Sequence, residues 1–182
     1  KTSIAGTGID EFKGITASSD GGIVVCGTSD SADEKEDSFF KNDLASRGGY
    51  DSYIIKYTND LTTKFVTPVR GQNNDIATSV IELSNGNYIM AGSTNSSTRD
   101  FKGVTTRGKK DIYVAGVNSN GTLMWVRSFG GTESDGALAL CKGADGGYVV
   151  VGETFSNNVD LDNISPYGGN GKTLAVMIKF PE

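Results

Sequence analysis

The segment Asp145-Gly146-Gly147-Tyr148-Val149-Val150-Val151-Gly152 decides the fold, because it occurs three times in the chain with small changes. Its Asp-Gly pair supplies the positive φ angles of a tight hairpin turn, and the apolar run that follows predicts a buried β-strand. The other two copies are Asp20-Gly21-Gly22-Ile23-Val24-Val25-Cys26-Gly27 and Asn85-Gly86-Asn87-Tyr88-Ile89-Met90-Ala91-Gly92. Three copies of one hairpin predict an all-β chain built from repeated units.

Each copy lies at the same place in a longer unit that begins with an aspartate and repeats after 65 and then 60 residues. The opening aspartates are Asp10, Asp75 and Asp135, and the apolar runs end at Gly27, Gly92 and Gly152. We expect these aspartates to be structural and to accept hydrogen bonds from backbone amides at a turn. One carboxylate in every unit fits a geometric requirement better than it fits a single active site.

Four antiparallel strands are expected in a complete unit. The first covers residues 12–18, 78–83 and 137–142, the second is the apolar run, the third covers 51–57, 111–117 and 174–180, and the fourth covers 64–67 and 124–129. Four such strands at this period predict the blade of a β-propeller. Trp125, whose counterpart in the first unit is Phe65, is expected in the core between neighbouring blades.

The unit boundaries predict a single repeat domain over residues 1–182, with blades at 10–74, 75–134 and 135–182. Residues 1–9 align with the end of a fourth strand and are expected to close the last blade, either within the chain or in a partner. Three blades are fewer than the four to eight of most propellers. Two interpretations therefore stay open, a segment of a longer array and a homodimer that forms a six-bladed ring.

The composition of the chain argues against several classes of function. The net charge of −5 and the pI near 4.8 argue against binding of nucleic acid or of an anionic membrane surface. The chain has no histidine, so Ser-His-Asp and Cys-His nucleophiles are excluded. Two acids could still hydrolyse a glycoside, but nothing distinguishes a pair among the 22. Cys26 and Cys141 are expected to be free, buried thiols rather than metal ligands.

The motifs Asp145-Gly-Gly-Tyr-Val-Val-Val-Gly-Glu-Thr154 and Asp111-Ile-Tyr-Val-Ala-Gly-Val-Asn-Ser-Asn-Gly-Thr-Leu-Met-Trp-Val-Arg-Ser-Phe-Gly-Gly-Thr-Glu-Ser-Asp135 resemble propeller-type repeats of bacterial secreted and surface proteins. The resemblance covers nearly the whole chain and implies a β-propeller fold and an extracellular or cell-envelope location. It implies no shared activity, because fold alone does not determine function. The pair Arg70-Gly71 stands where later units have Gly-Gly.

The loop between the second and third strands, called the long loop below, differs among the units. From the glycine of the second strand to the start of the third, the separation is 24, 19 and 22 positions. Loops of variable length on a constant scaffold commonly carry binding specificity. The candidate ligand residues in these loops are Phe40, Asp100, Phe101, Lys102, Phe155, Asp160 and Tyr167.

A large apolar residue recurs in the long loops as Phe40, Phe101 and Leu161. It could contact a ligand or anchor each loop to its blade, and the second interpretation is favoured. The acidic run at residues 30–37 is expected to be solvated and lacks the spacing of an EF-hand, so no cofactor is expected, although calcium stays open. We therefore expect a non-enzymatic module that binds a glycan or protein partner, with a structural spacer as the alternative and a carbohydrate-active enzyme third.

Overall fold

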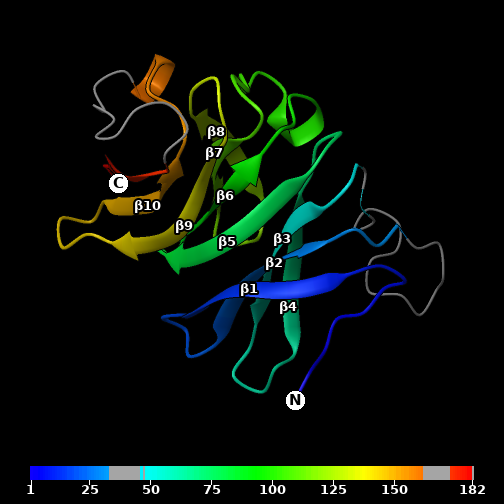
Figure 1. The fold of residues 1–182 in the computed structure, drawn as a ribbon. Coiled ribbons are helices and arrows are strands. Elements are labelled where there is room, and N and C mark those ends of the chain that lie inside the picture. Colours follow the sequence, from blue (N-terminus) through cyan, green and yellow to red (C-terminus); the bar gives the residue numbers. More distant parts are fainter. Residues whose placement is uncertain (33–45, 47, 162–172, 182) are drawn as a thin grey trace.

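The chain forms three antiparallel β-sheets and contains almost no helix (Figure 1). The computed structural model describes residues 1–32, 46, 48–161 and 173–181. The first sheet has the order β1-β2-β3-β4, the second β5-β6-β7-β8 and the third β9-β10-β11. The described strands close no barrel or ring. Among these residues, no helix has the length and apolarity needed to cross a membrane.

The strands follow the repeat closely. The first sheet contains β1 (Asp10–Ala17), β2 (Ile23–Ser29), β3 (Asp51–Tyr57) and β4 (Thr63–Val69). The second contains β5 (Asp75–Glu82), β6 (Tyr88–Thr94), β7 (Asp111–Val117) and β8 (Leu123–Phe129). The third contains β9 (Asp135–Lys142), β10 (Tyr148–Thr154) and β11 (Leu174–Phe180). The 3-10 turns η2 (Arg99–Phe101) and η3 (Val159–Leu161) lie in the second and third long loops.

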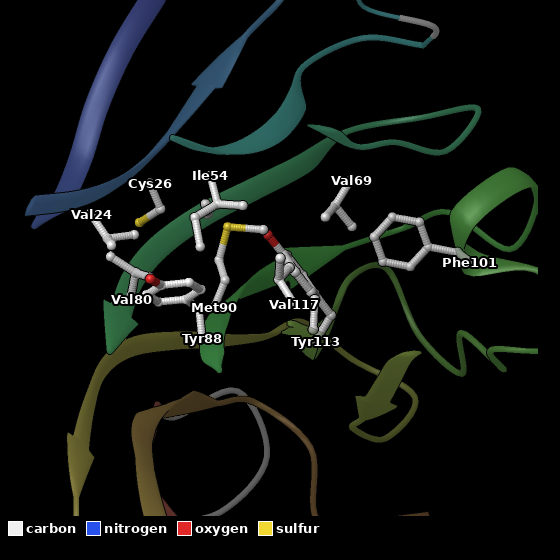
Figure 2. Packing of buried hydrophobic residues seen from close by; sticks show 12 residues of the cluster. Val24, Cys26, Ile54, Val69, Val80, Tyr88, Met90, Phe101, Tyr113 and Val117 are labelled. Atoms are coloured by element: carbon white, nitrogen blue, oxygen red, sulfur yellow. The ribbon is translucent and has the colours of Figure 1, made fainter. Parts of the chain in front are cut away.

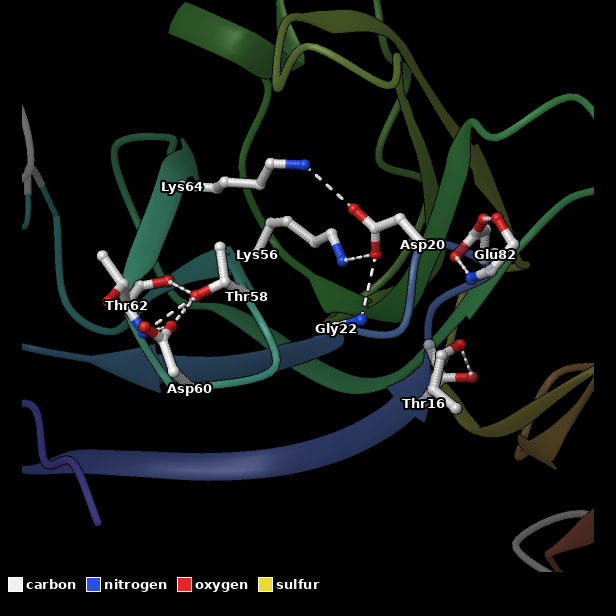
Figure 3. Close-up of polar contacts among 11 residues, drawn as sticks. Thr16, Asp20, Gly22, Lys56, Thr58, Asp60, Thr62, Lys64 and Glu82 are labelled. Atoms are coloured by element: carbon white, nitrogen blue, oxygen red, sulfur yellow. Dashed lines mark hydrogen bonds and ion pairs between the residues drawn. The ribbon is translucent and has the colours of Figure 1, made fainter.

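The hairpin turns between the first two strands have the backbone that their sequence predicts. Gly21, Gly86 and Gly146 have φ angles of +84°, +81° and +88°, which favour glycine because a Cβ atom is strained there. In the first turn, the Asp20 carboxylate accepts the backbone N–H of Gly22 at 3.1 Å. It also contacts Lys56 at 2.5 Å and Lys64 at 2.9 Å, so the turn is tied to β3 and β4 (Figure 3).

The sheets stack in chain order, with the first strand of each beside the first strand of the next. β5 contacts β1 on one side and β9 on the other, and Figure 1 shows these three strands side by side. Between the first two sheets, Ile54 and Met90 belong to one buried cluster with Tyr113 (Figure 2). A second cluster joins sheets two and three through residues such as Ile89 and Val150. The two central strands of the second sheet, β6 and β7, are therefore buried on both faces, as a continuous apolar run predicts.

Hydrogen bonds also cross between the sheets. The Tyr113 hydroxyl donates to the hydroxyl of Ser52 at 2.6 Å, and Ser52 donates to the carbonyl of Asp75 at 2.7 Å. From the third sheet, the backbone N–H of Leu140 donates to the Ser79 hydroxyl at 3.0 Å. These contacts satisfy polar groups inside the stack and align the sheets, because leaving such groups unpaired would be costly.

Three features differ from the sequence-based expectations. Residues 1–9 form no strand, and Ile4 instead packs beside Val25 and Tyr53 on the first sheet. Each first strand also has an irregular register at one residue, Lys13 in β1 and its equivalents in β5 and β9, which alternation alone does not reveal. Cys26 is buried as expected, but the expectation for Cys141 is wrong: its thiol is exposed because no described sheet packs on that side of β9.

Candidate functional site

The long loops and the connections between units lie at one edge of the stack, called the loop edge below. The three opening aspartates lie at this edge, at the start of β1, β5 and β9. Asp10 accepts the backbone N–H of Gly6 at 2.7 Å, and Asp135 accepts that of Gly131 at 2.8 Å. Asp75 and Asp135 are fully buried. Each carboxylate thus holds the connection that enters its unit.

The same carboxylates bind a pair of hydroxyl groups, one on the last residue of the second strand of each unit and one two residues later. Ser29 and Ser31 donate to Asp10 at 2.6 and 2.9 Å. The equivalent donors are Thr94 and Ser96 to Asp75, and Thr154 and Ser156 to Asp135. The sequence pattern Gly-x-(Ser/Thr)-x-Ser after each second strand carries this signal, which the sequence analysis missed.

The second serine of each pair also accepts a hydrogen bond from the incoming connection. Its hydroxyl accepts the backbone N–H of Gly8, Asn73 and Glu133 in the three units, at 2.9, 3.0 and 3.0 Å. The hydroxyl therefore bridges a backbone amide and a carboxylate in every unit. We call this repeated arrangement of aspartate and hydroxyl pair the aspartate frame.

A second buried aspartate opens the third strand of the first two units, Asp51 in β3 and Asp111 in β7. Asp111 accepts the backbone N–H of Arg107 at 2.6 Å through Oδ2, whereas its buried Oδ1 has no partner among the described residues. A Cβ atom at Gly130 would collide with both Asp111 and Asp135. Glycine is therefore required where the two carboxylates approach.

Burial changes the proton affinity of this group. It raises the pKa of Asp75 to about 7, although the hydroxyls of Thr94 and Ser96 oppose the rise. The nearby charge of Asp51 also raises the pKa of Asp75. Burial likewise raises the pKa of Asp111. Within the described ranges, no group of three or more carboxylates or thiols is placed to hold a metal ion.

The long loops are anchored by buried apolar side chains. Phe101 is fully buried and meets Tyr113 edge to face, with ring centroids 5.5 Å apart. Leu161 is buried in the cluster between sheets two and three. The anchoring interpretation of the recurring apolar residue therefore describes Phe101 and Leu161, whereas Phe40 lies outside the described residues.

Asp100 and Asp160 also hold the loops in place. The Asp100 carboxylate accepts the backbone N–H of Arg70 at 2.8 Å, and the Asp160 carboxylate accepts that of Gly130 at 3.3 Å. In both loops, the aspartate N–H donates back to the carbonyl of the same residue. Asp160 also pairs with the Arg107 guanidinium at 2.9 Å, which links the second and third long loops.

The residues preceding these aspartates, Arg99 and Val159, have φ angles of +58° and +61°. This left-handed conformation is unfavourable for residues other than glycine, especially for a β-branched valine. The reciprocal aspartate contacts and the apolar anchor, which occupy the next two positions in each loop, hold this conformation in place. As a result, Arg99 and Val159 project from the same position in the two loops, and both are exposed.

Amide side chains join the second and third long loops to the connections that precede them. Gln72 accepts the backbone N–H of Thr98 at 2.9 Å. In the next unit the amide side chain belongs to the long loop and not to the connection, and Asn158 accepts the backbone N–H of Thr132 at 3.1 Å. The contact therefore persists while the residue that provides it changes.

Residues 95–110 form the long loop that the structure describes completely, and they are basic. Five of these sixteen residues are Lys or Arg and one is Asp, in a chain with a net charge of −5. Arg107 forms an ion pair with Asp160 of the next unit, and Lys109 forms one with Glu133 of its own unit. Arg99 and Lys102 are exposed and have no partner among the described residues. The net charge of the whole chain conceals this basic loop.

The other sequence-derived positions lie as follows. Lys102 is exposed, and Phe155 is 39% exposed at the loop edge. Tyr167 lies outside the described residues. Trp125 is half-buried against the second core cluster, with the Arg127 guanidinium 5.2 Å from its ring. The glycines within the second strands, Gly27, Gly92 and Gly152, lie where the first strand approaches closely, and a Cβ atom there would collide with its backbone.

Removal of a hydroxyl from the aspartate frame should destabilise the fold. In Ser156→Ala, Asp135 loses one donor and the N–H of Glu133 loses its acceptor, so we expect a decrease of about 1–3 kcal/mol in the free energy of unfolding. Urea denaturation measures this change. Ser84→Ala, at an exposed turn, should change stability by less than about 0.5 kcal/mol. Equal effects of the two substitutions would contradict a structural frame.

The raised pKa of Asp75 predicts a specific pH dependence. Between about pH 4 and pH 7 the native state keeps a proton that the unfolded state releases, so this group makes the free energy of unfolding fall as pH rises. Asp75→Asn should therefore gain stability relative to the wild type across this range, by about 1.4 kcal/mol for each unit of pKa shift. Urea denaturation at several pH values tests this.

Asp20→Asn is the matched control for that measurement. Hydrogen bonds and ion pairs with Lys56 and Lys64 lower the pKa of Asp20, so this carboxylate stays ionised throughout the same range. Its substitution should shift stability by a nearly constant amount between about pH 5 and 7, because both the native and the unfolded carboxylate are ionised there. A sloping difference for Asp20→Asn, or a flat one for Asp75→Asn, would be inconsistent with the burial of Asp75.

Phe101 and Phe155 should respond differently to substitution. Phe101→Ala leaves a cavity in the core and should lower the free energy of unfolding by about 3–5 kcal/mol. Phe155→Ala removes a partly exposed ring and should cost less than about 1 kcal/mol. Thermal or urea denaturation of the two variants gives the comparison, and equal losses would indicate that Phe101 is not an anchor.

Comparison with known proteins adds no family to this description. No protein-family model matches the chain, and no curated protein matches it in sequence.

Proposed function

We propose that the chain is a β-propeller-type module of a bacterial extracellular or cell-envelope protein, and that it binds an anionic glycan at its loop edge without catalysing a reaction. The observation that carries this proposal is the basic loop at residues 95–110, held on a rigid frame in an otherwise acidic chain.

Support for the propeller comes from the order of the sheets. Each described unit is an antiparallel sheet whose strands are paired in chain order, and successive sheets pack face to face. Their first strands β1, β5 and β9 adjoin one another. Propeller blades are arranged in this way around an axis, with their first strands innermost.

Support for binding rather than catalysis comes from how the acids at the loop edge are used. A glycosidase needs two carboxylates that reach either side of the scissile bond. Asp75, Asp111 and Asp135 are instead fully buried. Asp100 and Asp160 accept backbone N–H groups that hold the loops. These roles stabilise a surface rather than present an acid to a substrate.

Support for an anionic ligand comes from Arg99 and Lys102. They flank the buried anchor Phe101, so their backbone positions are held by the core. Both side chains are exposed without a partner among the described residues, and a guanidinium can bind a carboxylate or sulfate through two hydrogen bonds. Preorganised loops lose less conformational freedom when they bind.

Support for a glycan comes from the other groups at this edge. The exposed Asn73 amide donates its N–H to the carbonyl of Asn95, and its amide oxygen can accept a hydrogen bond from a sugar hydroxyl. Phe155 presents part of its ring there, and aromatic rings can pack on the apolar face of a sugar. The combination of cations, an amide and a ring fits an acidic polysaccharide.

A structural assembly unit is the second candidate. The observation that favours it is the exposure of large apolar residues on the outer faces of the first and third sheets, Ile15 at 68% and Met177 at 73%. Exposed apolar faces usually mark contacts with other protein surfaces. This role is compatible with a loop edge that binds a glycan, because the two surfaces are separate.

Affinity electrophoresis tests the glycan proposal. The protein should be retarded in gels containing alginate or polygalacturonate and not in gels containing dextran. Arg99→Glu/Lys102→Glu should weaken binding at least tenfold, since two cationic contacts become repulsive. Lys13→Glu/Lys142→Glu makes the same charge change away from the loop edge and should bind like the wild type.

Three results would overturn the proposal. These are equal retardation by neutral and acidic polysaccharides, equal effects of the two double variants, and binding to polyglutamate without binding to either acidic polysaccharide. The last result would indicate a protein partner. Cleavage of a polysaccharide by the wild type would indicate an enzyme.

A further inference from the structure

The two end sheets of the stack, β1–β4 and β9–β11, each have one face turned away from the second sheet (Figure 1). Ile4 packs on part of the first of these faces, where Val25 and Tyr57 are buried, whereas Phe12 and Ile15 stay exposed. The first end face belongs to the sheet β1–β4 on the side away from the second sheet, and it includes Phe12, Ile15, Ile23, Val25 and Tyr57. The last end face belongs to the sheet β9–β11 on the side away from the second sheet, and it includes Ala139, Cys141, Val149, Val151 and Met177.

The internal repeat shows what normally covers the first end face. Ile15 pairs with Val25 in the first sheet, and Val80 pairs with Met90 at the same register in the second. Val80 is 3% exposed because the first sheet packs on it, whereas Ile15 is 68% exposed. The first end face is therefore equivalent to the face of the second sheet that packs against the first sheet.

The last end face has the opposite type. Met177 pairs with Val151, as Ile54 pairs with Cys26 in the first sheet and Val114 with Ala91 in the second. Ile54 and Val114 are fully buried by the next sheet along the chain, but Met177 is 73% exposed. Among the described residues, no further sheet packs on the last end face.

These two faces are complementary by the geometry of the chain itself. Wherever two sheets meet, a face of the last-end type packs on a face of the first-end type. We propose that a second copy of this chain docks head to tail, with the last end face of each copy on the first end face of the other. Two copies then supply six sheets, which lies within the range of closed propellers.

The first end face has room for this contact. A hollow of about 440 Å³ lies on it, lined by Phe12, Ile15, Val25 and Tyr57 and by the N-terminal residue Lys1. Where the first sheet packs on the second, the residue equivalent to Met177 is Ile54. Ile54 shares a buried cluster with Val80 and Met90, which are equivalent to Ile15 and Val25. By equivalence, Met177 of one copy would lie over Ile15 and Val25 of the other and fill this hollow.

The state in solution tests the proposal directly. Light scattering coupled to size exclusion should give about 38 kDa, twice the 19.1 kDa of one chain. Ile15→Lys and Met177→Lys each place a charge on one end face and should each produce a folded monomer. Met124→Lys alters a similarly exposed methionine, 46% exposed, that lies on neither end face, and should remain dimeric. Circular dichroism verifies that each variant is folded.

Mixing the two monomeric variants distinguishes head-to-tail docking from other modes. The intact last end face of Ile15→Lys can still dock on the intact first end face of Met177→Lys, so the mixture should recover a 1:1 dimer. A face that pairs with its own copy could not be restored in this way. A monomeric wild type, a dimer that survives both substitutions, or a mixture that stays monomeric would each overturn the proposal. The polysaccharide result has no bearing on this outcome.

Discussion

The contact between an aspartate and two hydroxyl groups at the start of each unit organises the loop edge, and in the second and third units this aspartate is fully buried. Burying a carboxylate is unfavourable unless hydrogen bonds replace its lost hydration. Asp135 obtains donors from Thr154, Ser156 and the backbone of Gly131. Because these donors come from the second strand and from the incoming connection, the carboxylate can be satisfied only when both have reached their native positions. The frame thus couples local strand pairing to the arrangement of successive units.

This coupling explains why the backbone of the loop edge can be constant while the side chains that it presents vary between units. The frame and the apolar anchors Phe101 and Leu161 repeat, whereas the residues between them do not. The contact between Gln72 and Thr98 in one unit corresponds to the contact between Thr132 and Asn158 in the next. The same connection is thus kept although the amide side chain comes from the other partner. Residues that project between such constraints can change with little cost to stability. Arg99 and Val159 occupy one such position and differ completely in chemistry.

Much of the fold could be predicted from the sequence because strand pairing here is local. The turn at Asp145-Gly146-Gly147 and the apolar run after it specify β10 directly, and the third strands were predicted at the observed residues. The irregular register at Lys13 was not predictable, since it depends on how one strand follows its neighbour. The environment of Cys141 was also missed, because exposure of β9 depends on whether another sheet covers that face.

The candidate site was harder to predict for a related reason. Phe101 and Lys102 are adjacent in sequence and belong to the same loop, yet one is in the core and the other in solvent. Composition cannot separate them, whereas the repeat can in part. The position of Phe101 is apolar in all three long loops, as Phe40, Phe101 and Leu161, whereas the position of Lys102 changes from Lys41 and Lys102 to Asp162. In a repeated scaffold, a residue type that recurs in every unit marks what each unit needs in order to fold, and a position whose charge changes between units is available for function. By that criterion the aspartates belong to the frame, and the loop cations are the residues for which we propose a role in ligand binding.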